Sequence, residues 1–312
     1  MDGHGKDLRI PALRRFAVAI TALNIAGQTF LGFEQAWAHL VVSVLTAYAT
    51  ELAIETIDAW ATRRTPRYAG GNVKLLDFLL SPHITGCAVA MLLYANGRLL
   101  PIAFASATAI ASKTLFRVRP PAPATPRHFL NPSNFGITAT LLLFPWVSIA
   151  PPYQFTENLY GIADWILPAI IIATGSFLNT KFTRKIPLIG GWLITFGLQA
   201  IVRTSFTGGA TLAALLPMTG TAFILFTFYM VTDPATTPVA PKRQIAFGAA
   251  VALVYGALVS AHVVFDLFFA LTIVTAARGV LLWAAALQTR PNETRQPVAA
   301  PPPLPVAVGS KL

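Results

Sequence analysis

The chain has 312 residues, of which 55% are hydrophobic and only 11% are charged. Together with a mean hydropathy of +0.62, this composition excludes an ordinary soluble domain and is typical of an integral membrane protein. The net charge of +11 does not indicate a nucleic-acid partner, because the basic residues are dispersed over loops and both tails. The lone Cys87 excludes an intrachain disulfide and a cysteine-ligated metal centre built from this chain alone. The sequence also has no paired-histidine zinc motif, and we expect no metal site.

Ten apolar segments follow one another along the chain, and most are close to the ~20 residues that a helix needs to cross hydrocarbon. Their approximate bounds are 15–33, 35–56, 74–94, 97–117, 134–150, 160–179, 186–203, 209–231, 244–262 and 265–287. The fifth segment is the shortest, and we expect it to be tilted or partly re-entrant. The pattern predicts an all-α, polytopic membrane protein with about ten transmembrane helices in one domain, residues 15–287. Residues 1–14 and the Pro-rich residues 288–312 are predicted to be tails, the second of them disordered.

The charges predict the orientation of these segments. Twenty of the 23 Lys and Arg residues lie in the two tails, in the even-numbered gaps or in the segment ends that border them. Cytoplasmic loops carry such an excess of Lys and Arg. Both termini and the even-numbered gaps are therefore predicted to be cytoplasmic, in a multi-pass protein of the cell membrane.

Two short polar motifs interrupt the apolar pattern on this cytoplasmic side. The first, Asn131-Pro-Ser-Asn134-Phe-Gly136, opens the fifth segment, and the second, Thr232-Asp233-Pro-Ala-Thr236-Thr-Pro238, follows the eighth. Proline at a first helical position leaves unpaired N–H groups that can hold an anion or a phosphate. The simpler interpretation is that both motifs only cap and end helices. The sequence leaves the two interpretations open.

At these residues the chain resembles a known family. "NPSNFG", followed by an apolar run, and "MVTDPATTP", followed by a basic pair, are similar to signatures of the D subunit of the Rnf electron-transport complex. The B subunit of the sodium-translocating NADH:quinone reductase carries similar signatures. The resemblance covers roughly residues 70 to 285. It implies two five-helix halves and flavin-dependent electron transfer coupled to ion movement.

The loop after the fifth segment departs from that family. Redox-active members carry there a Ser/Thr-rich segment whose Thr bonds covalently to FMN, whereas this chain has only Ala150 to Tyr160 with the single Thr156. Covalent FMN is therefore not expected, and FMN or riboflavin would have to bind non-covalently. The shortened loop is similar to a stand-alone branch of the family found among enediyne-type biosynthetic membrane proteins.

Ionisable side chains inside apolar segments are costly and usually face a partner or a cavity. Glu51 lies deep in the second segment and can serve an ion or proton path, whereas Glu55 and Asp58 can instead pair with arginines at the interface. The third segment holds two ionisable residues beside Pro82, and the last holds one cation that needs an anionic partner. These residues are Asp77, His83 and Arg278, and the candidate partners of Arg278 are Glu51 and Asp77.

Two hypotheses follow, and the sequence does not decide whether the protein is an enzyme. In the first, the protein is a redox or ion-translocating subunit that works with other membrane or redox subunits in the bilayer. Flavin or quinone would then bind near Asn131, Asn134, Thr232, Asp233 and Thr236, and the polar path would comprise Glu51, Asp77, His83 and Arg278. In the second, it is a redox-silent transporter or membrane scaffold for the biosynthesis of a specialised, enediyne-type metabolite.

Overall fold

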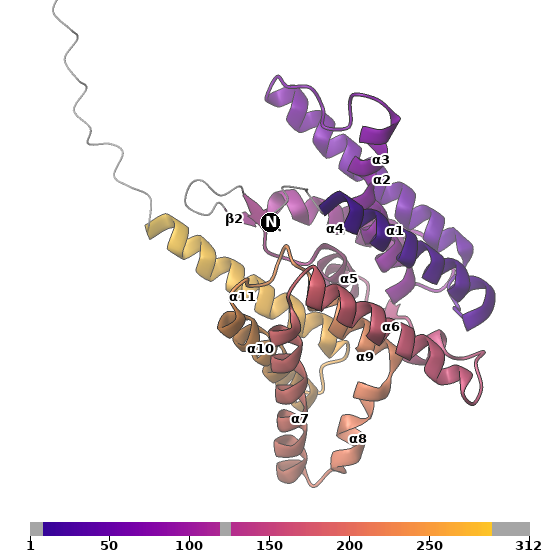
Figure 1. The fold of residues 1–312 in the computed structure, drawn as a ribbon, viewed down its shortest axis with the longest axis vertical. Helices are drawn as coiled ribbons and strands as arrows, with labels where there is room; N and C mark the ends of the chain where they lie inside the picture. Colours follow the sequence, from indigo (N-terminus) through magenta and orange to yellow (C-terminus); the bar gives the residue numbers. More distant parts are fainter. Residues whose placement is uncertain (1–8, 119–125, 289–312) are drawn as a thin grey trace, which may run out of the picture.

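The computed structural model describes residues 9–118 and 126–288 (Figure 1). Helices dominate this part of the chain, which confirms the predicted all-α class. The predicted tail 288–312 lies outside the described residues apart from Gln288, as does most of the tail 1–14.

The first half of the chain forms five helical stretches. Their bounds are α1 (Arg9–Ala26) with the π-helical turn η1 (Gly27–Leu31), α2 (Trp37–Ala61), α3 (Asn72–Leu92), α4 (Leu100–Leu115) and α5 (Pro132–Leu143). Two antiparallel pairs of short strands join them: β1 (Leu93–Tyr94) with β4 (Ser148–Ile149), and β2 (Arg117–Val118) with β3 (Arg127–His128). The 3-10 turn η2 (Pro152–Phe155) then leads toward the second half.

The second half also forms five helical stretches. They are α6 (Ala163–Lys181), α7 (Ile186–Thr207), a segmented third stretch, α10 (Pro241–Ser260) and α11 (Asp266–Gln288). The third stretch consists of α8 (Thr211–Leu215), η3 (Leu216–Thr219), α9 (Thr221–Leu225) and η4 (Phe226–Met230). Its two parts are bent by 65° where they join.

Each predicted apolar segment contains a helix, but the count of ten full spans is not confirmed. In the described part of the chain, seven helices are long and apolar enough to cross a membrane, or eight if the bent pair is one span. The exceptions are α4, with 16 residues, and α5, with 12. The predicted fifth span continued to residue 150, whereas α5 ends at Leu143. Pro145 disfavours helical backbone in the residue before it, and the chain beyond pairs through β4 with β1.

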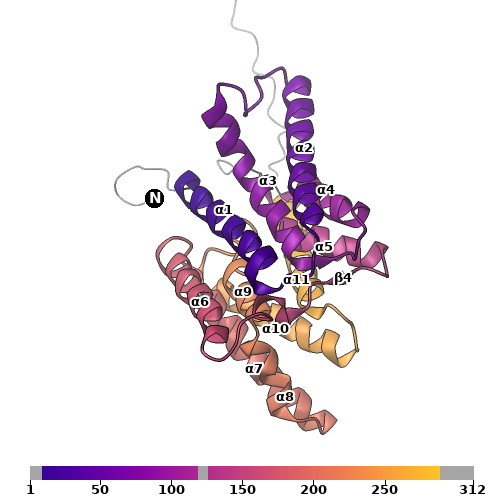
Figure 2. The same ribbon diagram turned by 90° about the vertical axis from the view of Figure 1, so that its right-hand side faces the viewer.

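Both halves pack their helices in the same order (Figures 1 and 2). In the first half α1 lies on α3, α2 contacts α3 and α4, and α4 lies on α5. In the second half α6 lies on α9 and η4, α7 packs along α10, and α10 contacts α11. Contacts between α5 and α11 join the two halves at the centre of the molecule.

Glycine allows the closest helix approaches. A Cβ atom at Gly136 of α5 would overlap the carbonyl oxygen of Ala105 in α4, and one at Gly248 of α10 would overlap that of Leu188 in α7. A backbone carbonyl cannot move aside as a flexible side chain can, so these contacts require a residue without a Cβ atom.

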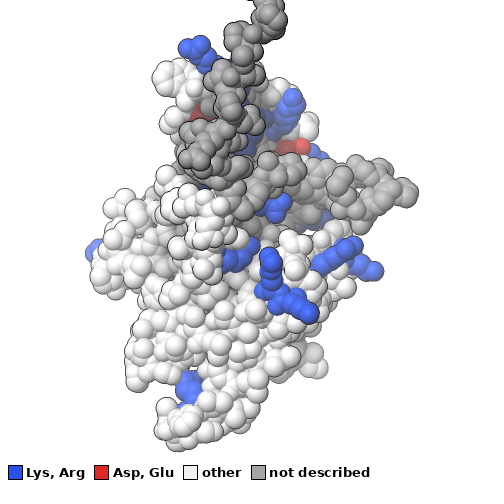
Figure 3. All heavy atoms as spheres, turned by 90° about the vertical axis from the view of Figure 1, so that its left-hand side faces the viewer, with Lys and Arg blue, Asp and Glu red and all other residues white. Residues whose placement is uncertain are grey.

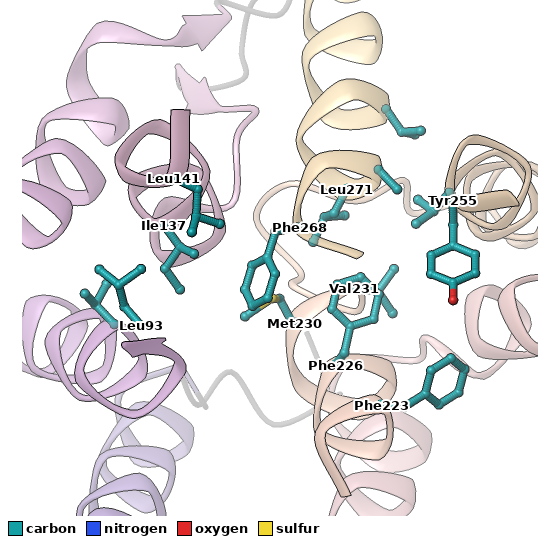
Figure 4. Close-up of a cluster of buried hydrophobic side chains, with 14 of the residues drawn as sticks. Leu93, Ile137, Leu141, Phe223, Phe226, Met230, Val231, Tyr255, Phe268 and Leu271 are labelled. Carbon is teal, nitrogen blue, oxygen red and sulfur yellow. The ribbon is translucent and has the colours of Figure 1, made fainter. Parts of the chain in front are cut away.

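The main hydrophobic core lies where the halves meet. Figure 4 shows Phe268 of α11 and Met230 of η4 between Ile137 of α5 and the aromatic residues of the second half. The outer surface also carries large apolar side chains, including the well-exposed Ile162, Phe206 and Trp283. Since such a surface is stable only against lipid tails, the protein is a multi-pass membrane protein.

Candidate functional site

The first polar motif caps a helix and also reaches the second motif. Asn131 precedes Pro132, and its side-chain oxygen accepts a hydrogen bond from the backbone N–H of Asn134 at 3.1 Å. Its side-chain nitrogen donates to the carbonyl oxygen of Met230 at 3.2 Å. The carbonyl belongs to the turn of η4 that leads into the second motif. The structure thus brings together two motifs that lie about a hundred residues apart.

Asn134 ties α5 to α11. Its side-chain nitrogen donates to the carbonyl oxygen of Phe268 at 3.0 Å and to the hydroxyl of Thr272 at 2.7 Å. The hydroxyl of Thr138, one turn further along α5, lies 2.9 Å from that of Thr272. The amide oxygen of Asn134 is buried without a hydrogen-bond partner among the described residues. Asn134 and Thr138 of α5 therefore hold the interface between the two halves.

The second motif folds into a turn around Asp233. The two carboxylate oxygens of Asp233 accept from the backbone N–H of Ala235 at 3.1 Å and the hydroxyl of Thr236 at 2.9 Å. The carbonyl oxygen of Asp233 accepts from Thr237 at 2.6 Å, and the Thr232 hydroxyl donates to the carbonyl of Phe228. The motif is thereby closed by its own side chains, as aspartate before proline favours.

Two cations complete the site. Arg278 of α11 donates to the carbonyl oxygen of Thr236 at 2.8 Å, and Lys185, just before α7, donates to that of Pro238 at 2.6 Å. Within the described part of the chain, neither cation makes a salt bridge within 4.0 Å. We call the assembly the junction, and its residues are Asn131, Thr232, Asp233, Thr236, Lys185 and Arg278.

Charge at the junction is predominantly positive. Burial lowers the pKa of Lys185 to about 8, although Asp233 opposes this effect, and the charge of Arg278 lowers the pKa further. Burial also lowers the pKa of His128 in β3, and Asp233 again opposes the change. Figure 3 looks at the face of the molecule on which α11 ends. Lys and Arg side chains gather over its upper and middle parts, and few acidic atoms lie among them. Such a site attracts an anion.

The predicted partners of Arg278 were wrong. Glu51 instead forms a salt bridge with Lys113 of α4 at 2.9 Å, and Lys113 also donates to Ser81 at 3.1 Å. Asp77 pairs with Arg14 of α1 at 2.7 Å. A backbone carbonyl takes the place of the expected carboxylate at Arg278.

His83 is fully engaged between three helices of the first half. One ring nitrogen lies 2.7 Å from the hydroxyl of Tyr48 in α2, and the other lies 2.7 Å from that of Thr21 in α1. Of the predicted polar path, Glu51, Asp77 and His83 thus belong to the first half, whereas Arg278 belongs to the junction. The structure does not bring the four into one continuous set of contacts.

The interface interpretation of the two remaining carboxylates agrees with the structure. Glu55 is 1% exposed and accepts from Arg64 and from Arg67, both of which follow α2. Asp58 also pairs with Arg64. These carboxylates hold the turn between α2 and α3.

Lys185 and Lys113 are functional candidates that the sequence reasoning counted only as markers of orientation. Lys113 lay inside the predicted fourth apolar segment, and this depth was a signal that it needs an acidic partner. Lys185 carried no comparable signal, because its acceptor is the distant carbonyl of Pro238.

The junction suits an anionic group better than a flat ring. Within the described residues Lys185 and Arg278 donate to carbonyl oxygens and to no carboxylate, so both cations can turn toward a phosphate. However, Gly279 of α11 lies so close to the ring of Phe129 that even a Cβ atom would overlap it, and Gly136 is equally close to α4. A flat ring such as an isoalloxazine therefore does not fit between the helices at these two positions.

Known proteins resemble part of this chain. No protein-family model matches it. Over 89 residues it is 33% identical to the D subunit of the ion-translocating oxidoreductase complex of Haemophilus influenzae strain Rd, and the same values hold for strains PittEE and PittGG. The match spans 28% of this chain and only a quarter of the length of these relatives, 25%. The protein is thus an all-α, multi-pass membrane protein with local similarity to the D subunit of an ion-translocating oxidoreductase complex.

Proposed function

We propose that the protein is a membrane subunit of an electron-transport complex, related to the D subunit of the Rnf complex, and that the junction is its cofactor site. The observation that carries this proposal is the convergence of both polar motifs with Lys185 and Arg278. The local similarity to an ion-translocating oxidoreductase subunit supports the same reaction class. The excess of Lys and Arg around the junction supports a cytoplasmic position for it and for both termini.

The proposed cofactor is non-covalent FMN, with riboflavin or a quinone as the less favoured occupants. Lys185 and Arg278 would hold the phosphate, which riboflavin and quinones lack. Asn131 and Thr236 would fix the backbone around these cations. A bound flavin supplies the ability to take up and release electrons singly or in pairs. Coupled ion movement would use the polar groups of the first half, Glu51, Asp77 and His83.

Titration of FMN with the purified protein tests this assignment. Binding is followed by quenching of flavin fluorescence in the wild type, in Arg278→Gln and in the control Arg15→Gln, which changes an exposed arginine of α1. Loss of one charge-assisted contact costs about 1.5 to 3 kcal/mol, so Arg278→Gln should bind FMN roughly 10- to 150-fold more weakly. Equal affinity in the two variants would refute the site, and absence of binding by the wild type would refute the cofactor.

Two observations favour a second candidate, a redox-silent transporter or scaffold for a specialised metabolite. The polar groups of the second motif already satisfy one another, as purely structural residues would. In addition, Thr156 is the one threonine between α5 and α6, where the redox-active proteins that the chain resembles have a Ser/Thr-rich segment that carries covalent FMN. A wild-type protein that binds no flavin, yet alters export of a metabolite when deleted, would support this candidate.

A further inference from the structure

A groove on the surface of the second half lies between α7 and α10, away from the junction. Its volume is about 500 Å³. The walls include Leu198 and Val202 of α7 and Leu253 of α10, all of which are more than half exposed. In a helix pair that crosses a membrane, these side chains face hydrocarbon. The groove therefore opens toward lipid.

Polar groups without partners line one end of this apolar groove. Gln199 is only 9% exposed, yet neither its amide nitrogen nor its amide oxygen has a hydrogen-bond partner among the described residues. The same holds for Nε of Arg203, which lies one helical turn further along α7. Arg203 makes no salt bridge within 4.0 Å among the described residues, although it is near enough to Asp266, at the start of α11, for the two charges to interact. A buried polar group without a hydrogen bond costs free energy, so we expect a partner outside the chain to bind these groups.

Gly256 shapes the groove beside Gln199. The amide oxygen of Gln199 lies where a Cβ atom of residue 256 would be. Only glycine at position 256 therefore leaves room for the side chain of Gln199. Rotation about its side-chain bonds brings the amide from this position into the open groove.

We propose that the groove binds one phospholipid, with its phosphate at Arg203, an ester carbonyl at Gln199 and an acyl chain that begins at Leu198 and Leu253, on the hydrocarbon side of Gln199. Four residues of helix separate the two polar side chains by about 6 Å. The polar layer on each side of the hydrocarbon is about 5 to 8 Å thick, so a phosphate and an ester carbonyl are separated by a similar depth. Arg203 lies near the end of α7, where an arginine reaches headgroup phosphates. A free phosphate would leave the apolar walls and Gln199 without a partner.

Native mass spectrometry of the full chain in detergent, with added phosphatidylglycerol, tests this proposal. The wild type should retain one tightly bound phospholipid after most lipid has been removed. Arg203→Gln should raise the apparent Kd roughly tenfold or more, and Gln199→Leu should raise it several-fold. The matched control is Arg98→Gln, which removes an arginine stacked on the ring of Trp146 at 4.4 Å and should leave lipid binding unchanged.

Several results would overturn the proposal. These are equal lipid binding by Arg203→Gln and the control, release of the lipid by inorganic phosphate alone, and recovery of an isoprenoid quinone in place of the phospholipid. Leu253→Trp provides a second variant that does not remove a charge. Because it fills the groove from an exposed position, it should expel the lipid, and retention of the lipid would contradict the assigned place. The test is independent of flavin binding at the junction.

Discussion

Replacement of Asn131 by alanine should destabilise the protein by removing the two hydrogen bonds that this side chain makes with the backbone. The first is the cap of α5, a hydrogen bond accepted from the N–H of Asn134, and an N-cap contributes about 1 kcal/mol. The second is the hydrogen bond donated to the carbonyl of Met230. This carbonyl also accepts from the N–H of Asp233 at 3.4 Å, so losing the contact with Asn131 costs about 0.5 to 1.5 kcal/mol. The expected loss is therefore about 1.5 to 2.5 kcal/mol. At about 2 to 4 °C per kcal/mol, Tm should fall by roughly 3 to 10 °C.

Serine at position 131 separates the two contributions. Serine caps helices as well as asparagine does but is too short to reach Met230. Asn131→Ser should therefore lose only the contact between the motifs and melt between the wild type and Asn131→Ala.

The buried thiol of Cys87 provides the assay. Cys87 is the only cysteine of the chain and is 1% exposed. A thiol-reactive fluorescent dye should therefore label the protein only as it unfolds, and the labelling temperature reports stability. If Asn131→Ala melted with the wild type, the argument that this side chain holds the two motifs together would be refuted. If Asn131→Ser melted with Asn131→Ala, the cap would contribute nothing.

Three further predictions use the same thiol assay. Burial lowers the pKa of Lys185 to about 8, whereas the same side chain in the unfolded chain keeps a pKa of about 10.4. Unfolding therefore takes up a proton between these two pH values, and the free energy of unfolding should rise with pH across this window. Lys185→Gln should abolish that rise, and an unchanged pH profile would contradict it. Glu51 and Lys113 form a salt bridge, so Glu51→Gln and Lys113→Met should each destabilise the protein by about 3 to 5 kcal/mol. The double variant should lose clearly less than the sum of the two single losses. Additive losses would mean that the pair is not coupled. Gly248→Ala should cost about 1 to 3 kcal/mol through its clash with α7, whereas Gly190→Ala, which meets nothing within 4 Å, should be neutral or stabilising; equal effects would refute the close approach.

Helix positions followed from the sequence because they depend on local properties. The apolar runs determine where the helices form. Pro132 begins α5, as the first motif predicted. The end of α5 was missed because it depends on the distant pairing of β4 with β1 and on Pro145. Hydropathy alone does not separate a full span from a short helix followed by an apolar turn.

The sequence singled out both motifs and Arg278 as candidates, but it predicted neither their contacts nor the part played by Lys185. The sequence placed both motifs on one side of the membrane, yet their meeting depends on the packing of η4 beside Asn131. Because opposite charges attract, the sequence suggested a carboxylate as the partner of Arg278. The observed acceptor is a backbone carbonyl, and the pattern of side chains in a sequence does not reveal such a partner. The two motifs also occupy different places in their halves. One precedes the fifth helical stretch of the first half, and the other precedes the fourth of the second half, so a sequence repeat cannot align them.

The absorbance spectrum of the detergent-purified protein, before and after acid precipitation, tests the proposed function most directly. The account predicts flavin bands in the wild type, recovery of FMN in the supernatant after precipitation, and weak or absent bands in Arg278→Gln. A colourless wild type from cells that make flavin normally would contradict the cofactor site. Flavin retained on the precipitated chain would contradict the non-covalent attachment.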